Sequence, residues 1–239
     1  MNARPAIGAF FDLDGTLLAA PSLEWRFLGY LLQRDEITTV NVARWAAHTG
    51  RNFLSRGHSA VCANKDYLAG IRESIVEEWE KTVEPGSLPL FAEGINLVYW
   101  HLERRHSVVL VTGTLAPLAR AIAHHLPCGV QVRATELEIV DGCFTGRIAG
   151  THLSFEQKAR LILEEAGKCD LDLFRSFAYG NEMSDVRMLE AVGHPAAVNA
   201  SWRLKRQARK RSWPVYGWSS SRETMQRATG ATLATKEAR

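Results

Sequence analysis

The segment that decides the fold of this chain reads Ala6-Ile-Gly-Ala-Phe-Phe-Asp-Leu-Asp-Gly-Thr16. Its first half is a short, continuous apolar run, which is typical of a strand buried on both faces in a parallel sheet. The run stops abruptly at Asp12, and Asp14 follows two residues later. Open α/β sheets bind their ligands outside the carboxyl ends of the strands. We therefore expect Asp12 and Asp14 to face a site at that edge.

Outward from this segment, the later part of the chain alternates between strand-like and helix-like patterns. Strands are predicted at 108–111, 174–179 and 196–198, and helices at 92–104, 115–125, 155–166 and 186–192. A polar turn is predicted at Thr112-Gly-Thr114, and a hairpin at 137–147 turns at Asp141-Gly142. This alternation predicts an α/β protein with a Rossmann-like core, in which helices flank a parallel sheet.

Residues 18–88 differ in character, because no strand-like run interrupts their helical patterning. Apolar residues recur at helical spacing at Leu23, Phe27, Leu28, Leu31 and Leu32, and 67–83 reads as a second long helix. We therefore expect an all-helical cap domain at 18–88, inserted into a core formed by 1–17 and 89–218. Residues 219–239 are rich in Ser, Thr, Ala and Lys, and they are expected to form a mobile tail.

The composition allows a substantial core, since 46% of the 239 residues are hydrophobic. The net charge of +3 is too small to indicate a nucleic-acid partner, and none is expected. Much of the excess lies in 203–211, where Leu204 and Ala208 stand four residues apart and predict the inward face of a helix. The basic side chains are then expected to form its solvated face. Binding to an anionic membrane surface is the alternative for the same run.

The remaining composition favours an ordinary protein of the reducing cytoplasm. The four cysteines lie far apart and form no CxxC pair, which argues against zinc and against a disulfide framework. We find no apolar signal-peptide core near the start and no apolar run of the roughly 20 residues that span a bilayer. The histidines form no metal-binding motif such as HExxH. We therefore expect a cytoplasmic location.

Polar groups that follow predicted strands or begin a helix carry the chemistry. They are Asp12 with Asp14, Thr112, Lys158, and Asn181 with Asp185. With their surroundings, these groups resemble the haloacid dehalogenase (HAD) superfamily, and more closely its subfamily IB, the phosphoserine phosphatase-like branch with a helical cap after the first strand. The resemblance covers about residues 6–218. It rests on Asp12-Leu-Asp-Gly-Thr16, Leu110-Val-Thr-Gly113, Glu156-Gln-Lys-Ala-Arg160 and Tyr179-Gly-Asn-Glu-Met-Ser-Asp185.

The resemblance implies a Mg²⁺-dependent phosphomonoester hydrolase that works through an aspartyl-phosphate on Asp12. A phosphate monoester repels an attacking carboxylate, so cations must offset its charge. Mg²⁺ prefers oxygen ligands, and the implied ligands are the Asp12 carboxylate, the Asp14 carbonyl, Asn181 and Asp185. Asp14 is the implied general acid and base, and Lys158 stabilises the charge. The remaining implied contacts to phosphate or substrate come from Thr112, Gly113, Gly15, Thr16 and Arg56.

Two positions depart from the family pattern. Asn181 stands where an aspartate is usual, and its amide brings no negative charge, so weaker Mg²⁺ binding is expected. Pro21 stands where serine-phosphate enzymes carry a glutamate that grips the substrate amine, and Glu24 follows one helical turn later. Strict phosphoserine specificity is therefore not expected. The aromatic and arginine-rich cap suits a small phosphorylated metabolite, phosphoserine-like or otherwise, or a lysophospholipid-type phosphate.

Other interpretations of the same residues stay open at this point. Asp12 and Asp14 could cap a helix or a turn, Thr112 could be a plain turn residue, and Lys158 could be a solvated lysine. The same catalytic groups could also transfer the phosphoryl group to an alcohol acceptor instead of water. A catalytically weak protein that binds phosphorylated ligands is the alternative from another class, and Asn181 is its support. Nothing in the sequence indicates the oligomeric state.

Overall fold

The computed structural model of the protein describes residues 5–56, 64–84 and 86–219, with side chains left out for 52–56. The tail expected at 219–239 therefore lies outside the described residues, apart from Ser219. Among the described helices, none has both the length and the apolar content that crossing a bilayer requires.

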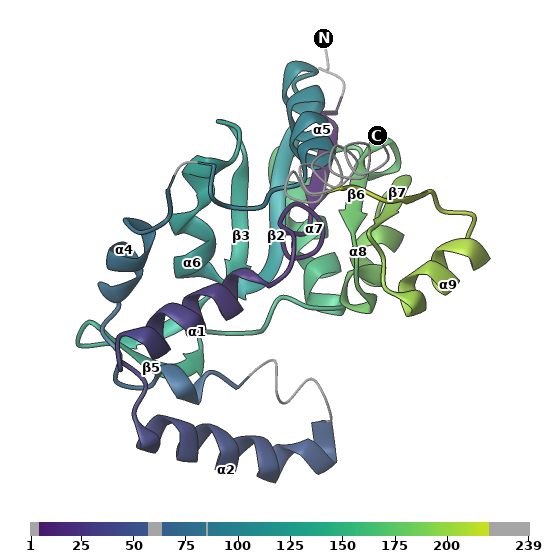
Figure 1. The fold of residues 1–239 in the computed structure, drawn as a ribbon. Coiled ribbons are helices and arrows are strands. Elements are labelled where there is room, and N and C mark those ends of the chain that lie inside the picture. Colours follow the sequence, from purple (N-terminus) through teal and green to yellow (C-terminus); the bar gives the residue numbers. More distant parts are fainter. Residues whose placement is uncertain (1–4, 57–63, 85, 220–239) are drawn as a thin grey trace, which may run out of the picture.

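A parallel sheet of six strands forms the centre of the molecule, as predicted (Figure 1). Its order is β3-β2-β1-β6-β7-β8, and every pairing is parallel. The strands are β1 (Gly8–Phe11), β2 (Ser107–Leu115), β3 (Gln131–Thr135), β6 (Phe177–Gly180), β7 (His194–Val198) and β8 (Val215–Tyr216). Gly8–Phe11 of the predicted apolar run form the central strand β1, and all four of these residues are buried.

Helices cover both faces of this sheet, and the alternation along β1 shows how. Phe11 packs into a core with α5 (Ala92–Glu103) and α6 (Ala116–Ala121), which a short 3₁₀ turn, η2 (Ala123–His125), extends. Phe10 points the other way, into a second core. That core is closed by α7 (Glu156–Cys169), α8 (Val186–Glu190) and α9 (Trp202–Lys210). Successive side chains of a strand point to opposite faces, so one strand feeds both cores.

The N-terminal insert is built mainly of helices, as expected, but not of two long ones. α1 (Leu23–Gln33) buries Leu23, Phe27 and Leu31, and α2 (Thr39–Arg56) follows it. The predicted second helix at 67–83 is wrong, because the segment forms only η1 (Asp66–Leu68) and α4 (Ile75–Glu80). Gly70, at a φ of 84°, turns the chain there, and its N–H donates to the Phe144 carbonyl instead of continuing a helix.

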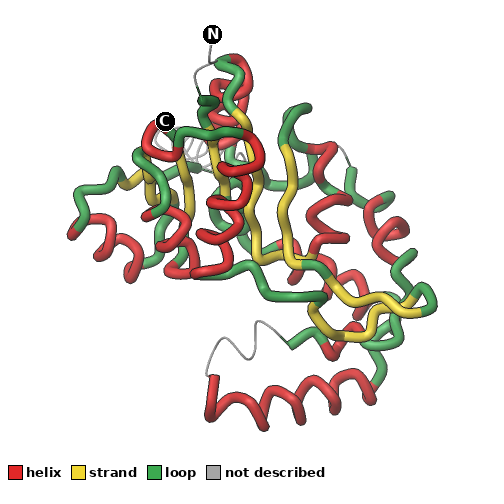
Figure 2. Tube along the Cα trace, turned by 180° about the vertical axis from the view of Figure 1, so that it is seen from behind, coloured by secondary structure: helices red, strands yellow, loops and turns green. Residues whose placement is uncertain are grey.

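A small antiparallel hairpin joins the insert to the core. It consists of β4 (Leu137–Val140) and β5 (Cys143–Ile148), with Asp141 and Gly142 in the turn, as the sequence predicted. Figure 2 shows this hairpin reaching away from the main sheet toward the N-terminal helices. Arg72 of the insert forms a β-bridge with Cys143. The backbone pairing of the insert with the hairpin is what ended the helical pattern predicted at 67–83.

Three further boundaries in the core differ from the prediction. β3 was not predicted, because its sequence Gln-Val-Arg-Ala-Thr is polar enough for the partly exposed edge where it lies. β2 continues through Thr112-Gly-Thr114, where a turn was predicted, and a register shift against β3 absorbs the polar residues. β6 starts at Phe177 instead of residue 174, since Leu173–Arg175 form a short 3₁₀ turn, η3.

Candidate active site

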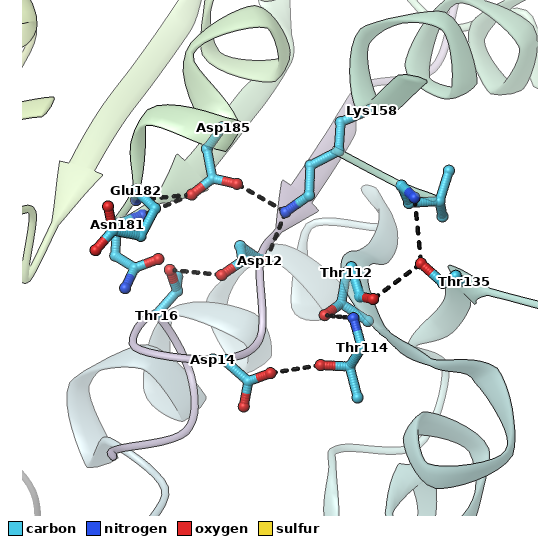
Figure 3. A network of polar contacts seen from close by, with 12 residues as sticks. Asp12, Asp14, Thr16, Thr112, Thr114, Thr135, Lys158, Asn181, Glu182 and Asp185 are labelled. Atoms are coloured by element: carbon cyan, nitrogen blue, oxygen red, sulfur yellow. Dashed lines mark hydrogen bonds and ion pairs between the residues drawn. The ribbon is translucent and has the colours of Figure 1, made fainter. Parts of the chain in front are cut away.

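The predicted polar residues gather at the carboxyl edge of the sheet. Asp12 follows β1 directly, and its N–H donates to the Tyr179 carbonyl of β6 at 2.9 Å. This bond holds the loop after β1 against the loop after β6. Figure 3 shows Asp12, Asp14, Thr112, Lys158, Asn181 and Asp185 around one space, although they come from four separate parts of the chain. The structure therefore places these six side chains close to one another.

Lys158 is the centre of the site. Lys158 lies in the first turn of α7, and only 2% of it is exposed. The alternative that Lys158 is a solvated surface lysine is therefore wrong. Its ammonium lies 2.6 Å from Asp12 Oδ1 and 2.7 Å from Asp185 Oδ1. Burial alone would lower the pKa of Lys158, but the carboxylates of Asp12 and Asp185 outweigh it and hold that pKa above its usual range. Lys158 is therefore a fixed positive charge between two buried carboxylates.

The nucleophile candidate, Asp12, lies in a site that is short of positive charge. Burial raises the pKa of Asp12 to about 7, although Lys158 acts in the opposite direction. Asp185 and Asp14 add negative charge nearby and contribute to the same rise. Three carboxylates thus lie near one ammonium, which contacts only Asp12 and Asp185 of the three. Such an arrangement favours a further cation, or a ligand that brings one.

The loop after β6 is shaped by Asp185. Asp185 Oδ2 accepts hydrogen bonds from the N–H groups of Asn181 (3.0 Å) and Glu182 (2.9 Å), while Oδ1 binds Lys158. A Cβ at Gly180 would lie 2.6 Å from the Asp185 Cβ, so this close return of the chain requires glycine. Asp185 therefore joins the loop to the lysine with both of its oxygens engaged.

Asn181 lies against the loop that carries Asp12. Gly15 has a φ of 83°, and a Cβ there would lie 1.9 Å from Asn181 Nδ2, so glycine is needed for both conformation and space. Thr16 also belongs to this loop, and its hydroxyl donates a long hydrogen bond of 3.4 Å to Asp12 Oδ2. Gly15 and Thr16, which the resemblance implied as phosphate or substrate contacts, thus shape the loop and contact Asp12.

Asp14 is held from two sides. Its Oδ1 accepts the Leu23 N–H at 2.7 Å, and its Oδ2 accepts a short hydrogen bond from the Thr114 hydroxyl. Leu23 is the first residue of α1, so the helix-start interpretation of Asp14 is correct for one oxygen. Burial raises the pKa of Asp14, and the Thr114 hydroxyl partly opposes that rise. Sequence reasoning missed Thr114, although the Thr112-Gly-Thr114 motif contained it.

Thr112 and Gly113 line the β2 side of the same space. Thr112 is 1% exposed, and its hydroxyl oxygen accepts the Thr114 N–H at 3.1 Å. The Gly113 carbonyl accepts a hydrogen bond of 2.9 Å from Thr135, whose hydroxyl also contacts His152 at 3.1 Å. These bonds connect the end of β2 to the segment before α7. Figure 3 shows Thr112 on the same side of the site as Thr114 and Thr135.

A charged cluster of the insert, which sequence reasoning missed, lies near Asp14 and His152. The Lys65 ammonium, with its side chain 5% exposed, donates to Glu24 Oε1 at 2.5 Å, and the Tyr67 hydroxyl donates to the same oxygen at 2.6 Å. Burial, together with the nearby charge of Lys65, lowers the pKa of His152 to about 4. The side chain of Arg56, predicted to bind substrate, lies outside the described residues. Nothing in the sequence around Lys65 marks it as buried, because its partner Glu24 lies 41 residues away.

The acidic residues and the buried lysine lie at the carboxyl edge of an open parallel sheet, which is where Rossmann-like folds bind their ligands. The chain belongs to the haloacid dehalogenase-like hydrolases, whose family model matches residues 9–190. It is 30% identical to a probable phosphatase of Mycobacterium tuberculosis over 98% of this chain and 84% of that protein. It is also 31% identical to a phosphoserine phosphatase of M. tuberculosis over 95% and 75% of the two chains.

A solved structure shares the fold of this chain. The crystal structure of a protein of unknown function from Bordetella pertussis matches with a TM-score of 0.71 and 29% identity, covering 89% of this chain and 98% of that one. With its fold, its family and these relatives, the protein is a HAD-type phosphatase of the phosphoserine phosphatase-like branch, a phosphoric monoester hydrolase.

Proposed function

We propose that this phosphatase hydrolyses a small phosphate monoester through a covalent aspartyl-phosphate on Asp12. The observation that carries the proposal is the buried Lys158 ammonium, which lies 2.6 Å from Asp12 and 2.7 Å from Asp185. A buried cation that contacts the nucleophile can offset the charge of both the carboxylate and the incoming phosphoryl group. Such preorganised charge is a large contribution to catalysis in many enzymes.

In the first step, a carboxylate oxygen of Asp12 attacks phosphorus as the bond to the leaving oxygen breaks. Asp14 donates a proton to that oxygen, which leaves as an alcohol. In the second step, Asp14 takes a proton from water as the water attacks the acyl phosphate, and this releases inorganic phosphate and restores Asp12. The hydrogen bonds from Leu23 and Thr114 support this role, because they fix the Asp14 carboxyl group in one orientation.

The donors in this site fit Mg²⁺. The Asp12 carboxylate, the Asp14 carbonyl and the Asn181 amide would hold the ion, which when bound would supply positive charge to the phosphoryl oxygens. Among the described residues, no three His, Cys, Asp or Glu side chains gather to hold a metal by themselves. Mg²⁺ keeps several waters when bound, so a few oxygen donors from the protein suffice. The charge deficit around Asp12 supports the same assignment.

We assign different tasks to Asn181 and Asp185, both of which the sequence placed at the metal. Both oxygens of Asp185 already accept hydrogen bonds, so we propose that it positions Lys158 and the Asn181 backbone. Asn181 lies against the Asp12 loop and is the better candidate ligand. Asn181→Asp should tighten Mg²⁺ binding, measured by titration calorimetry, because it adds a negative charge. Unchanged affinity would count against Asn181 as a ligand.

The insert at 18–88 is proposed to act as a cap domain that selects the leaving group. Glu24 is the nearest equivalent of the amine-binding glutamate, but it already accepts hydrogen bonds from Lys65 and Tyr67. A relative is named as a phosphoserine phosphatase. The internal pairing of Glu24 supports a substrate whose leaving group differs from serine, within the class of small phosphate esters. The free cysteines among the described residues are in keeping with a cytoplasmic enzyme.

The test is release of phosphate from an aryl phosphate with and without Mg²⁺. We expect activity that requires Mg²⁺ and that Asp12→Asn abolishes. The matched control is Asp141→Asn, in the exposed hairpin turn, where the same chemical change should have no effect. Equal activity of Asp12→Asn and the control would refute the proposal. Binding of the ester without turnover would indicate the ligand-binding alternative, and phosphorylated product in the presence of an alcohol would indicate transfer.

A further inference from the structure

The solvent face of α9 carries a dense group of cations beside an exposed indole. Leu204 and Ala208 are fully buried, so they define the inner face of the helix. The opposite, outer face of the helix carries Trp202, Arg206, Arg209 and Lys210. The three cations come four, seven and eight residues after Trp202, which places them on the same face as the indole. Trp202 is 68% exposed, an unusual exposure for so large an apolar side chain. We call these four residues the outer face of α9.

The charged side chains of this face are all positive. The helix sequence Trp202–Lys210 contains no acidic residue, and Arg203 and Lys205 flank the outer face with two more cations. Within the described part of the chain, only Arg211 of this basic run forms an ion pair, with Glu190 at 2.6 Å. The remaining cations are exposed. A solvated helix face usually mixes both signs of charge, so this uniform composition requires a reason.

The outer face is rigidly joined to the catalytic edge of the sheet. The N–H of Ser201, the residue before α9, donates to the Asn181 carbonyl at 2.9 Å. Trp202 therefore comes directly after Ser201, which is hydrogen-bonded to the loop that carries Asn181. Figure 1 shows α9 at the outer side of the core beyond β7, away from α1 and α2, so the insert does not cover it.

We propose that the outer face of α9 docks this protein on an anionic phospholipid bilayer. Lipid phosphates would bind the cations, and the Trp202 indole would sit at the level of the headgroups, where tryptophan is enriched in membrane proteins. Charge complementarity favours an anionic partner. A polynucleotide would need only the basic side chains for binding. The exposed indole and the single short helix therefore favour a lipid surface over a polynucleotide. Docking would bring the catalytic edge close to the bilayer, and that consequence alone rests on the proposed function.

The test is sedimentation with phosphatidylcholine vesicles that contain or lack phosphatidylglycerol. The full chain should bind only the anionic vesicles, and added salt should weaken binding because it screens the charges. Glutamine suits the substitutions, since it removes charge while keeping helix propensity. The test variant combines Arg206→Gln, Arg209→Gln and Lys210→Gln. The control variant combines Lys81→Gln, Arg147→Gln and Lys168→Gln, which are exposed cations outside α9.

We expect the test variant to bind anionic vesicles at least about tenfold more weakly than the control variant. Trp202→Ala should also weaken vesicle binding, and the difference in binding between this variant and the wild-type chain should persist at high salt. No binding of the wild-type chain to anionic vesicles, or equal loss in the test and control variants, would overturn the proposal. So would α9-dependent binding to duplex DNA without binding to vesicles.

Hydrolysis of a soluble aryl phosphate provides the independent readout. All of these variants should retain it, because none of the changed residues belongs to the catalytic site, and this shows that each variant is folded. Vesicle binding by a chain that lacks all phosphatase activity would leave the docking surface intact and refute only the proposed function.

Discussion

Replacing Lys158 by methionine is the sharpest test of the catalytic site. The change keeps most of the side-chain volume but removes the ammonium that contacts Asp12 and Asp185 at 2.6 and 2.7 Å. At an effective dielectric constant of about 20, each contact corresponds to a Coulomb energy of about 6 kcal/mol before the cost of desolvation. Removing one partner of a buried pair typically costs about 3–5 kcal/mol in net terms.

These magnitudes predict two measurable effects. The free energy of unfolding should fall by about 3–5 kcal/mol, because two buried carboxylates lose their shared cation. The value of kcat/KM for an aryl phosphate should fall by about 10²–10³, since Lys158 no longer stabilises the developing charge. Denaturant unfolding and steady-state kinetics at saturating Mg²⁺ measure the two effects on the same preparations.

The matched control is Lys168→Met on the same helix. Lys168 is exposed, and its nearest carboxylate is Glu165 at 3.7 Å, so both effects should be small. The reasoning fails if Lys158→Met keeps kcat/KM within about tenfold of Lys168→Met. It also fails if the two variants unfold at the same denaturant concentration, because Lys158 would then not hold two buried carboxylates together.

Three further predictions follow from individual contacts. Thr114→Val should lower kcat about 10- to 100-fold and Thr114→Ser should restore it, since only the hydroxyl holds Asp14; an unchanged valine variant would exclude this positioning role. Gly15→Ala should abolish activity, because a Cβ would lie 1.9 Å from Asn181 Nδ2, and full activity would show that the loop can move aside. Burial lowers the pKa of His101 to about 3, so the unfolded state binds the proton first and stability should fall below pH 6.5. His101 contributes at most about 1.4 kcal/mol per pH unit to this slope, so denaturant unfolding between pH 7 and pH 5 should show a smaller slope for His101→Gln than for the wild-type chain; equal slopes would contradict the assignment.

Local patterns predicted the elements whose burial repeats along the chain. The continuous apolar run before Asp12 predicts a central strand, and its residues Gly8–Phe11 are all buried, while the spacing of Leu23, Phe27 and Leu31 predicts one face of a helix. Patterns failed where long-range pairing decided the backbone. The segment at 67–83 has helical spacing, but Gly70 donates to the hairpin and the helix is interrupted.

The residues of the candidate site also divide into those that a local pattern locates and those that only the folded structure brings together. The acidic pair after the first strand could be located from sequence, because a polar residue at the end of a buried strand is a local signal. Lys158 could be placed there only through the family resemblance, since its partner Asp12 lies 146 residues away. Lys65 and Thr114 were missed, because a lysine or a threonine looks the same on a surface and in a site.

The sequence by itself determined the alternation of strands and helices in the core and the acidic loop after the first strand, because each depends on neighbouring residues, and the family resemblance added the class of chemistry. Only the tertiary structure decided which charges share the site. The single ammonium between Asp12 and Asp185, the grip of Thr114 on Asp14 and the internal pairing of Glu24 with Lys65 all depend on distances across the folded chain. Electrostatic energy depends on those distances and on burial, and neither is a property of a local stretch of sequence.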